Sequence, residues 1–556
     1  MNAVLQPSSL RLLAWCAVGT ALVHVVLWRS ADVEGLSLIF AYLLKVYDVH
    51  GNFVLMAVVA GAFLLRRRPD ALPLVQFAAE RPWTIAALMF PLLSLGSLWV
   101  YQAYPVSMDE YAALFQAKAF AAGKLSGAFP PELLDRLIPR IHQGTFLSVS
   151  RSTGEVAGTY WPGFALLLAP FAWLGVPWAA NPMIGALTIP AIHRLTLRLT
   201  ASREAAGWAV LLTVASPAFI VTSISYYSMA AHLLCNLLYA LLLLSPSIPR
   251  ALAAGLLGSL ALVLHQPVAH LVFGFAFVVW LLFRPGSAGI LAALLVGYLP
   301  ALAIGLGWQH HLIDVTRAAQ PAAPAPKAPA LLDSVGGRLS AVTLPQRLAI
   351  ESRIAGFSKD WTWSAPGLLV LALYGYLAAR AHSGAKLLGA ALAVTFFAYF
   401  FFPLDQGHGW GNRYLYSAWF VLPVLAGIAL ATASGKQGDE LRGMAAWAIV
   451  FSLLVADGLR LLQVHSFIDR QLSQVPPLAR AAEPGQREVI FINPTAGFYA
   501  HDRVQNDPFL RGARVTMVFD RQENVAALMA TRFPGFRKTE EGSWGERWTA
   551  TVAPDE

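Results

Sequence analysis

Residues 106–115 read VSMDEYAALF and place two adjacent carboxylates, Asp109 and Glu110, at the start of an apolar helical run. Ser107 and Glu110 have the spacing of a capping box, in which each side chain accepts the backbone N–H of the other residue. The capping box accounts for Glu110 without a catalytic role. Asp109 is not needed for it and is left for another role.

The pattern after these carboxylates predicts a helix over 108–125, with few charges and apolar residues along one side. Such a helix suits the surface of a bilayer, so we expect it to lie along the outer membrane face. A carboxylate at its start would then sit where a lipid headgroup and an aqueous acceptor can meet.

Apolar sequence dominates the rest of the chain. Of its 556 residues 57% are hydrophobic and only 13% are charged, whereas soluble domains carry about a quarter charged residues. Long apolar runs recur from end to end, which predicts a mainly α-helical, polytopic integral membrane protein. The net charge of +9 is expected in cytoplasmic loops and does not indicate a nucleic-acid partner. Cys16 and Cys235 lie in apolar runs and are predicted to be buried thiols.

Thirteen apolar runs are predicted as membrane spans. They cover 10–28, 50–66, 83–101, 179–199, 205–223, 228–246, 250–266, 268–284, 287–308, 364–380, 386–402, 413–432 and 444–462. Two further apolar pieces, 35–47 and 159–175, are predicted to be interfacial or re-entrant. The second contains Pro162 and Pro170, which interrupt a straight helix.

Basic residues follow every even-numbered span, which assigns those loops to the cytoplasm. These residues are Arg66, Arg67, Arg68, Arg198, Arg203, Arg250, Arg284, Arg380, Lys386, Lys436 and Arg442. The N-terminus is then cytoplasmic. Loops 102–178, 309–363 and 403–412 and the tail 463–556 face the outside.

The tail contains no span and predicts a small external α/β domain. Its strands are expected at 487–492, 513–519 and 547–552, with a helix at 523–533. Further upstream, the stretch AAQPAAPAPKAPA at 318–330 is typical of an extended Pro/Ala linker.

Three stretches in this order resemble the GT-C superfamily of polytopic glycosyltransferases, which includes the protein O-mannosyltransferases and the lipid A aminoarabinose transferases. They are MDEYAALFQAKAFAAGKL at 108–125, TYWPGFALLLAPFAWLG at 159–175 and GNRYLYSAWFVLPVL at 411–425. The resemblance implies two additional N-terminal spans at 1–82 and a GT-C-like catalytic region at 83–462. The external domain at 463–556 follows, with no role implied by the resemblance.

This resemblance also implies a reaction. A sugar would pass from a polyprenyl-phosphate-linked donor to an acceptor hydroxyl at the outer face of the membrane. The membrane expected is the bacterial inner membrane, whose outer face meets the periplasm. The acceptor would be a lipid, a glycan or a protein. Asp109 is the expected catalytic base and Glu110 the less favoured candidate, and a single displacement predicts inversion at the anomeric carbon.

Other polar residues near the predicted outer face are candidates for binding the donor phosphate or sugar. Arg413 offers a planar fork of donors suited to phosphate, beside Tyr414 at a span start. The remaining candidates are Arg140, His142, His265 and Lys359. Interfacial turns, ordinary hydrogen-bonded histidines and solvated charges are the simpler interpretations. Histidines can bind a divalent metal, but no ligand set such as HExxH is present, so no metal ligand is assigned and no cofactor is firmly expected.

Two other classes of function fit part of the pattern. A transporter or flippase of a lipid-linked or amphiphilic solute accounts for the spans but not for the long first external loop. The absence of an evident internal repeat weakens it further. A non-catalytic assembly protein would use the tail to bind a partner in the cell envelope.

Overall fold

The computed structural model describes residues 7–30, 32–67, 72–317, 344–402, 405–519 and 524–551. Its residues form two compact units. We call the described parts of 7–97, 181–303 and 344–463 the helical unit, and 98–180, 304–317 and 464–551 the loop–tail unit. The predicted linker 318–330 and Arg68 lie outside the described residues.

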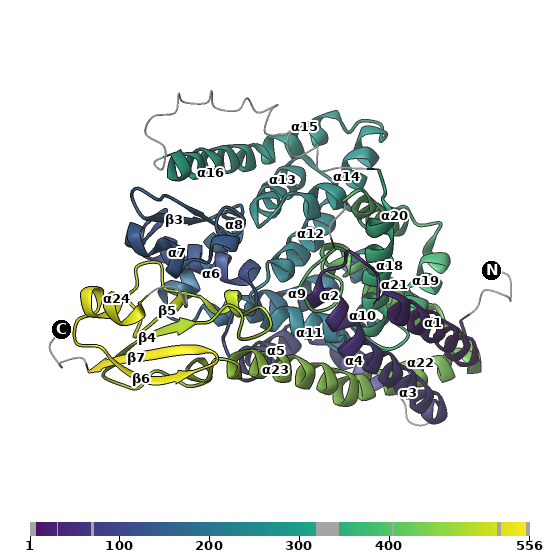
Figure 1. Cartoon of the computed structure of the whole chain (residues 1–556). Helices are drawn as coiled ribbons and strands as arrows, with labels where there is room; N and C mark the ends of the chain where they lie inside the picture. Colours follow the sequence, from purple (N-terminus) through teal and green to yellow (C-terminus); the bar gives the residue numbers. More distant parts are fainter. Residues whose placement is uncertain are drawn as a thin grey trace. The chain divides into compact units, whose positions relative to one another are not determined.

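Helices make up the helical unit (Figure 1). The first group comprises α1 (Ser9–Ser30), α2 (Leu38–Leu43), α3 (Val49–Leu65), α4 (Leu72–Glu80), α5 (Pro82–Leu95), α9 (Ala180–Thr200), α10 (Arg203–Val214), α11 (Pro217–Ile224) and α12 (Met229–Leu243). The second comprises α13 (Ile248–Val263), α14 (Val268–Leu282), α15 (Ala288–Gly297), α16 (Leu299–Arg317), α18 (Arg347–Thr362), α19 (Leu368–Ala379), α20 (Ser383–Ala398), α21 (Val421–Thr432), α22 (Gly435–Phe451) and α23 (Asp457–Ser473). Helices α16 and α23 continue into the loop–tail unit.

Six helices of the described chain are long and apolar enough to cross a membrane, and a seventh span results if α10 and α11, bent by 60°, count as one. The six are Ser9–Ser30, Leu38–Leu65, Pro82–Val100, Ala288–Arg317, Ser383–Phe401 and Gly435–Ser473. Six further apolar helices are shorter, at 10–17 residues. Each of the thirteen predicted spans overlaps a helix over part or all of its length, but the match is incomplete: the span predicted at 413–432 begins eight residues before α21 (Val421–Thr432). Helix α8 (Gly163–Trp173), inside the piece predicted not to cross, is only 11 residues long.

The prediction of a separate interfacial piece at 35–47 is wrong. Helix α2 continues through a π turn, Leu44–Asp48, into α3, so that Leu38–Leu65 is one 28-residue helix. Asp48 interrupts the apolar run in the sequence, but in the fold it receives Lys359 Nζ at 2.6 Å and Arg460 Nη1 at 3.2 Å. A buried carboxylate paired in this way no longer breaks an apolar helix.

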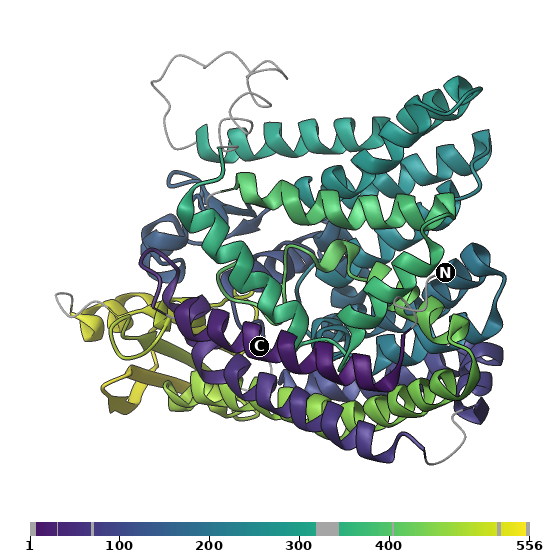
Figure 2. The same cartoon turned by 90° about the vertical axis from the view of Figure 1, so that its right-hand side faces the viewer.

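Two loops that the basic residues assign to the same side are in contact in the helical unit. Glu440, after the twelfth predicted span, pairs with Arg66 and Arg67, after the second, at 3.2 and 3.0 Å. Helices α1, α3 and α22 lie side by side here, as Figures 1 and 2 show.

Predicted outer loops are also in contact with one another. Ser37 Oγ donates to Asp405 Oδ1 at 2.9 Å, and Asn412 Nδ2 donates to Asp360 Oδ2 at 2.6 Å. Segment 32–37, helix α18 and loop 405–412 are thereby connected to one another.

The loop–tail unit contains both sheets of the described chain. The segment 102–178, predicted as the first external loop, forms α6 (Met108–Ala121), α7 (Leu134–Leu137), α8 and a small antiparallel sheet of β1 (Gly127–Ala128), β3 (Glu155–Gly158) and β2 (Leu147–Val149), in the order β1-β3-β2. The tail forms a sheet of order β5-β4-β7-β6, in which β4 pairs parallel with β5 and antiparallel with β7. Its elements are β4 (Gln486–Ile492), β5 (Arg514–Val518), α24 (Val525–Arg532), β6 (Arg537–Gly542) and β7 (Gly545–Thr551).

Three strands and the helix of the tail match the predicted elements, whereas β6 was not predicted. Its sequence, RKTEEG, is almost entirely polar because it forms the exposed edge of the sheet. Charged edge strands of this kind prevent pairing with other chains, and they lack the alternation by which a strand is predicted.

Loop and tail share one hydrophobic core. Tyr111 and Phe115 of α6 and Phe129 of the loop pack with Phe491 of β4 and Met517 of β5. The expectation that α6 presents its apolar side chains to the bilayer is therefore wrong, because they are buried by other residues of the protein. The helix also ends at Ala121 rather than 125, since Gly123 adopts a left-handed φ of +70°.

Candidate functional site

Glu110 is a buried structural carboxylate. Its Oε1 accepts Tyr101 Oη at 2.8 Å, and its Oε2 accepts the backbone N–H groups of Val106 at 2.9 Å and Ser107 at 3.3 Å. The side chain is fully buried, and the predicted capping box with Ser107 is formed. Glu110 therefore holds the start of α6 and faces no solvent.

Asp109, one residue earlier, has a different environment. It is partly exposed, and Tyr160 Oη donates a hydrogen bond to its Oδ1. Neighbouring helix positions point about 100° apart, so the two carboxylates of this pair cannot act on the same group. Asp109 is thus the carboxylate of the pair that solvent can reach.

Tyr160 is itself fixed in place by the loop–tail unit. Its carbonyl oxygen accepts Trp308 Nε1 at 2.8 Å, and its ring packs edge-on against Phe146, with centroids 6.2 Å apart. It belongs to the stretch TYWPGF, whose aromatic and proline residues end β3 and begin α8. The loop therefore supplies both the carboxylate and the group that orients it.

The tail fastens the N-terminal part of α6 by hydrogen bonds. Tyr111 Oη donates to the Asn506 carbonyl at 2.8 Å and accepts the Asn506 N–H at 2.7 Å. Gln505 Nε2 donates to the Pro105 carbonyl at 2.8 Å. Burial raises the pKa of Tyr111, and the hydrogen bond from Asn506 offsets only part of this effect, so the phenol stays protonated. The stretch at 498–512, to which the sequence assigned no role, thus positions the Asp109 helix.

Arg140 and His142 lie in the same unit but have structural partners. Arg140 Nη2 pairs with Asp135 Oδ2 at 2.7 Å and is largely exposed. Partial burial raises the pKa of Asp135, but hydrogen bonds from Arg151, Gln143 and Arg140 outweigh it and lower the pKa to about 2. His142 is buried, with Nε2 3.2 Å from Asp502 Oδ1.

Arg413 lies in the helical unit, in a glycine-rich loop. Its Nη1 donates to the carbonyl groups of Gln406 at 3.0 Å and His408 at 2.8 Å, and its guanidinium carbon stands 4.5 Å from the Tyr227 ring centroid. Gly409 permits this path, because a Cβ there would lie 2.4 Å from Arg413 Cδ. The guanidinium is half-buried and held in a fixed orientation.

Tyr414 stabilises the same loop. Its Oη donates to the Asp405 carbonyl at 2.7 Å, its ring stacks on Tyr399 with centroids 4.6 Å apart, and Arg353 stands 4.2 Å above it. Tyr414 thus has a packing role beside Arg413.

Two further predicted residues lie elsewhere in the helical unit. Lys359 is fully buried in its ion pair with Asp48, and His265 is half-buried in the turn between α13 and α14. The structure therefore brings Asp109, Glu110, Arg140 and His142 into the loop–tail unit. It places Arg413, Tyr414, His265 and Lys359 in the helical unit.

Metal ligands do not group in the part of the chain that the structure describes: no three His, Cys, Asp or Glu side chains are placed to hold an ion. Four residues that shape these environments were missed in the sequence, namely Tyr101, Tyr160, Tyr227 and Asn506. Tyr160 lies in a stretch that carries the resemblance, but no local pattern pairs any of the four residues with its partner.

Comparisons with known proteins bear on the fold. No protein-family model matches the chain, and no curated protein matches it. Among solved structures, ArnT from Cupriavidus metallidurans bound to undecaprenyl phosphate is 12% identical, with a TM-score of 0.53 over 85% of this chain and 99% of that one. The apo structure of the same protein is 13% identical, with a TM-score of 0.46 over 84% and 99%. The likeness to the first structure shows that the chain has the GT-C fold of ArnT, and the resemblance noted in the sequence is confirmed at the level of the fold.

Proposed function

We propose that the chain is a membrane glycosyltransferase that moves a sugar from a polyprenyl-phosphate donor to an acceptor hydroxyl. The observation that carries the proposal is the GT-C fold shared with ArnT, whose solved structure holds undecaprenyl phosphate. Asp109, which is partly exposed beside a fully buried Glu110, supports it by offering one carboxylate that solvent can reach.

In this proposal Asp109 is the general base. An acceptor hydroxyl is a weak nucleophile, so Asp109 accepts its proton as the oxygen attacks the anomeric carbon. The bond from that carbon to the phosphate oxygen breaks, and its electron pair leaves with the polyprenyl phosphate. One displacement inverts the anomeric configuration. A positioned base of this kind typically contributes ~10²–10⁴-fold to the rate.

Arg413 is the residue that we assign to the donor phosphate. Its guanidinium is held by two carbonyl groups and by the Tyr227 ring, which fixes the orientation of the guanidinium plane. A fixed planar fork suits an anionic phosphate and stabilises the charge that develops on the leaving oxygen.

The topology that we propose has thirteen spans, a cytoplasmic N-terminus and an external loop–tail unit in a bacterial inner membrane. The grouping of Glu440 with Arg66 and Arg67 supports it. Single cysteines at Arg67, Ser126 and Ser543, in a background without Cys16 and Cys235, test it with an impermeant thiol reagent. We expect labelling from outside at Ser126 and Ser543 only; labelling at Arg67 would contradict the orientation.

A purified-protein assay tests the function itself. Labelled polyprenyl-phosphate sugars are supplied to the protein in vesicles, and both transfer and movement of intact donor are measured. Sugar transfer to an acceptor is the expected result. Movement of intact donor without transfer would identify a transporter or flippase, and neither activity across a donor panel would favour an assembly protein.

A further inference from the structure

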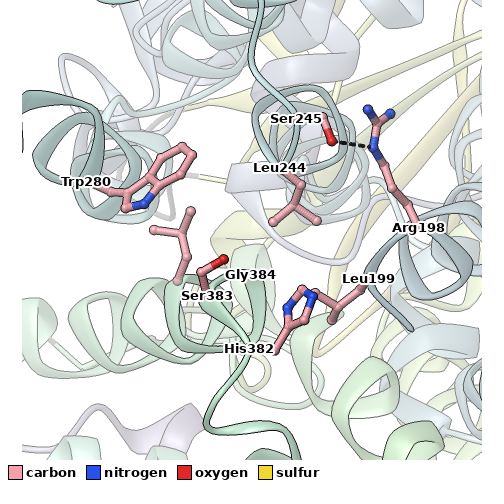
Figure 3. Close-up of a pocket in the computed structure, with 9 residues that line it drawn as sticks. Arg198, Leu199, Leu244, Ser245, Trp280, His382, Ser383 and Gly384 are labelled. Atoms are coloured by element: carbon pink, nitrogen blue, oxygen red, sulfur yellow. Dashed lines mark hydrogen bonds between the residues drawn. The ribbon is translucent and has the colours of Figure 1, made fainter. Parts of the chain in front are cut away.

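A small pocket opens in the helical unit where the ends of four apolar helices meet (Figure 3). Its volume is about 60 Å³. Its polar lining comes from Arg198 at the end of α9, Ser245 after α12, and His382 and Ser383 at the start of α20. Trp280 of α14 lies across the pocket from Arg198. Arg198, Leu244, Ser245 and Trp280 lie near the ends of the fourth, sixth and eighth predicted spans, and His382 follows the tenth.

Arginine side chains gather at this pocket. Arg198 Nε donates to Ser245 Oγ at 3.2 Å, and Arg250 Nη1 donates to the carbonyl of the same serine at 3.0 Å. Arg194 and Arg250 are close enough for their charges to act on Arg198. Among the described residues, none of these three arginines forms an ion pair.

The N-terminus of α20 adds to this field. His382 occupies the N-cap position, but its side chain makes no capping hydrogen bond, and the next two residues, Ser383 and Gly384, line the pocket. The unpaired first-turn N–H groups of a 16-residue helix favour an anion. Gly384 keeps the space open, because a Cβ there would lie 2.7 Å from Leu199 Cδ1.

The surroundings of the pocket are those of a membrane surface. Ile248, Leu282 and Phe283, at the neighbouring helix ends, are exposed apolar residues. Arg284 stands 5.1 Å from the Trp280 ring centroid, and such Trp–Arg pairs are typical of the headgroup level. An anion at this depth would have apolar surface beside it for acyl chains.

We propose that this pocket binds the phosphate group of an anionic membrane lipid. About 10–15 Å³ is needed for one water, so 60 Å³ accommodates the oxygens of one phosphate but not a sugar or a nucleotide. Free phosphate shares the charge but not the acyl chains, and the exposed apolar helix ends favour the lipid. The site is independent of the proposed transfer reaction.

Delipidated protein in zwitterionic nanodiscs tests the proposal, with phosphatidylglycerol as the probe and native mass spectrometry and thermal shift as readouts. We expect one tightly held phosphatidylglycerol per chain, and affinity about fivefold lower in Arg198→Gln, as for loss of one cation near an anionic surface. Arg198→Lys keeps the charge and should retain most of the affinity. Arg380→Gln, an exposed arginine that does not line the pocket, is the matched control and should bind as wild type.

Three outcomes would overturn the proposal. The first is unchanged phosphatidylglycerol affinity in a folded Arg198→Gln protein. The second is an equal loss in Arg380→Gln, which would indicate general surface charge. The third is inorganic phosphate alone binding as tightly as the lipid, which would assign the pocket to free phosphate.

Discussion

Tyr160 donates a hydrogen bond to Asp109 across 51 residues of sequence, and both residues belong to the loop–tail unit. The adjacent Glu110 is enclosed by Tyr101 and the backbone of Val106 and Ser107. The two neighbouring carboxylates thus have different environments. Glu110 stabilises the start of the helix, whereas Asp109 is partly exposed to solvent and is oriented by the Tyr160 hydroxyl.

Tyr160→Phe should lower the rate of transfer without unfolding the protein. A hydrogen bond to a charged group contributes about 1.5–3 kcal/mol, so loss of orientation at Asp109 should reduce kcat roughly tenfold or more. Tyr104→Phe is the matched control, because the buried Tyr104 hydroxyl has no hydrogen-bond partner among the described residues. Equal kinetics for both variants would remove Tyr160 from the site.

Glu110→Gln should act mainly on stability. The carboxylate of Glu110 accepts hydrogen bonds from the Tyr101 hydroxyl and from two backbone N–H groups. The glutamine NH2 group cannot accept, so at least one of these buried donors would lose its partner, at a cost of about 1–3 kcal/mol. Thermal unfolding in detergent measures the loss. Glu132→Gln, which removes a surface ion pair with Arg532, should change the midpoint little. A stable Glu110→Gln protein with abolished turnover would instead make Glu110 the base.

Asn506→Ala tests whether the tail holds the Asp109 helix. The side chain donates to the carbonyl groups of Leu137 and Thr516 and accepts the Thr516 N–H at 2.8 Å. Its removal leaves buried groups unpaired and should cost about 2 kcal/mol or more. Protease sensitivity of the tail should rise, and transfer should fall with it. Asn524→Ala, at the exposed cap of α24, should cost only ~1 kcal/mol and leave transfer unchanged. Wild-type protease resistance in Asn506→Ala would contradict the role of Asn506 in holding the Asp109 helix.

Arg413 should determine donor affinity. Arg413→Ala removes the guanidinium and should weaken binding of a polyprenyl-phosphate sugar. Arg413→Lys should restore it only in part, because an ammonium lacks the planar fork. Arg347→Lys, at an exposed arginine paired with Glu351, is the matched control. Unchanged donor binding in Arg413→Ala would exclude this residue from the phosphate site.

The sequence predicts the helices well because apolarity is a local property, and each predicted span overlaps a helix over part or all of its length. The prediction fails where residues distant in the sequence change the environment of a side chain. Asp48 ends an apolar run in the sequence, but Lys359 and Arg460 pair with it in the structure and the helix continues. The capping box at Glu110 was readable from a spacing of three residues. The partners of Asp109 and Tyr111 were not, because Tyr160 and Asn506 approach only through the fold.

Single-turnover transfer by Asp109→Asn tests the central claim most directly. Asparagine keeps the shape and can still accept the Tyr160 hydrogen bond, but it cannot take a proton. Labelled donor is pre-bound, acceptor is added, and donor affinity and thermal stability are measured on the same protein, with Asp135→Asn as a control in the same unit. We predict a rate lower by ~10²–10⁴-fold with donor binding and stability near wild type. A near-normal rate in Asp109→Asn would contradict the assignment of Asp109 as the base.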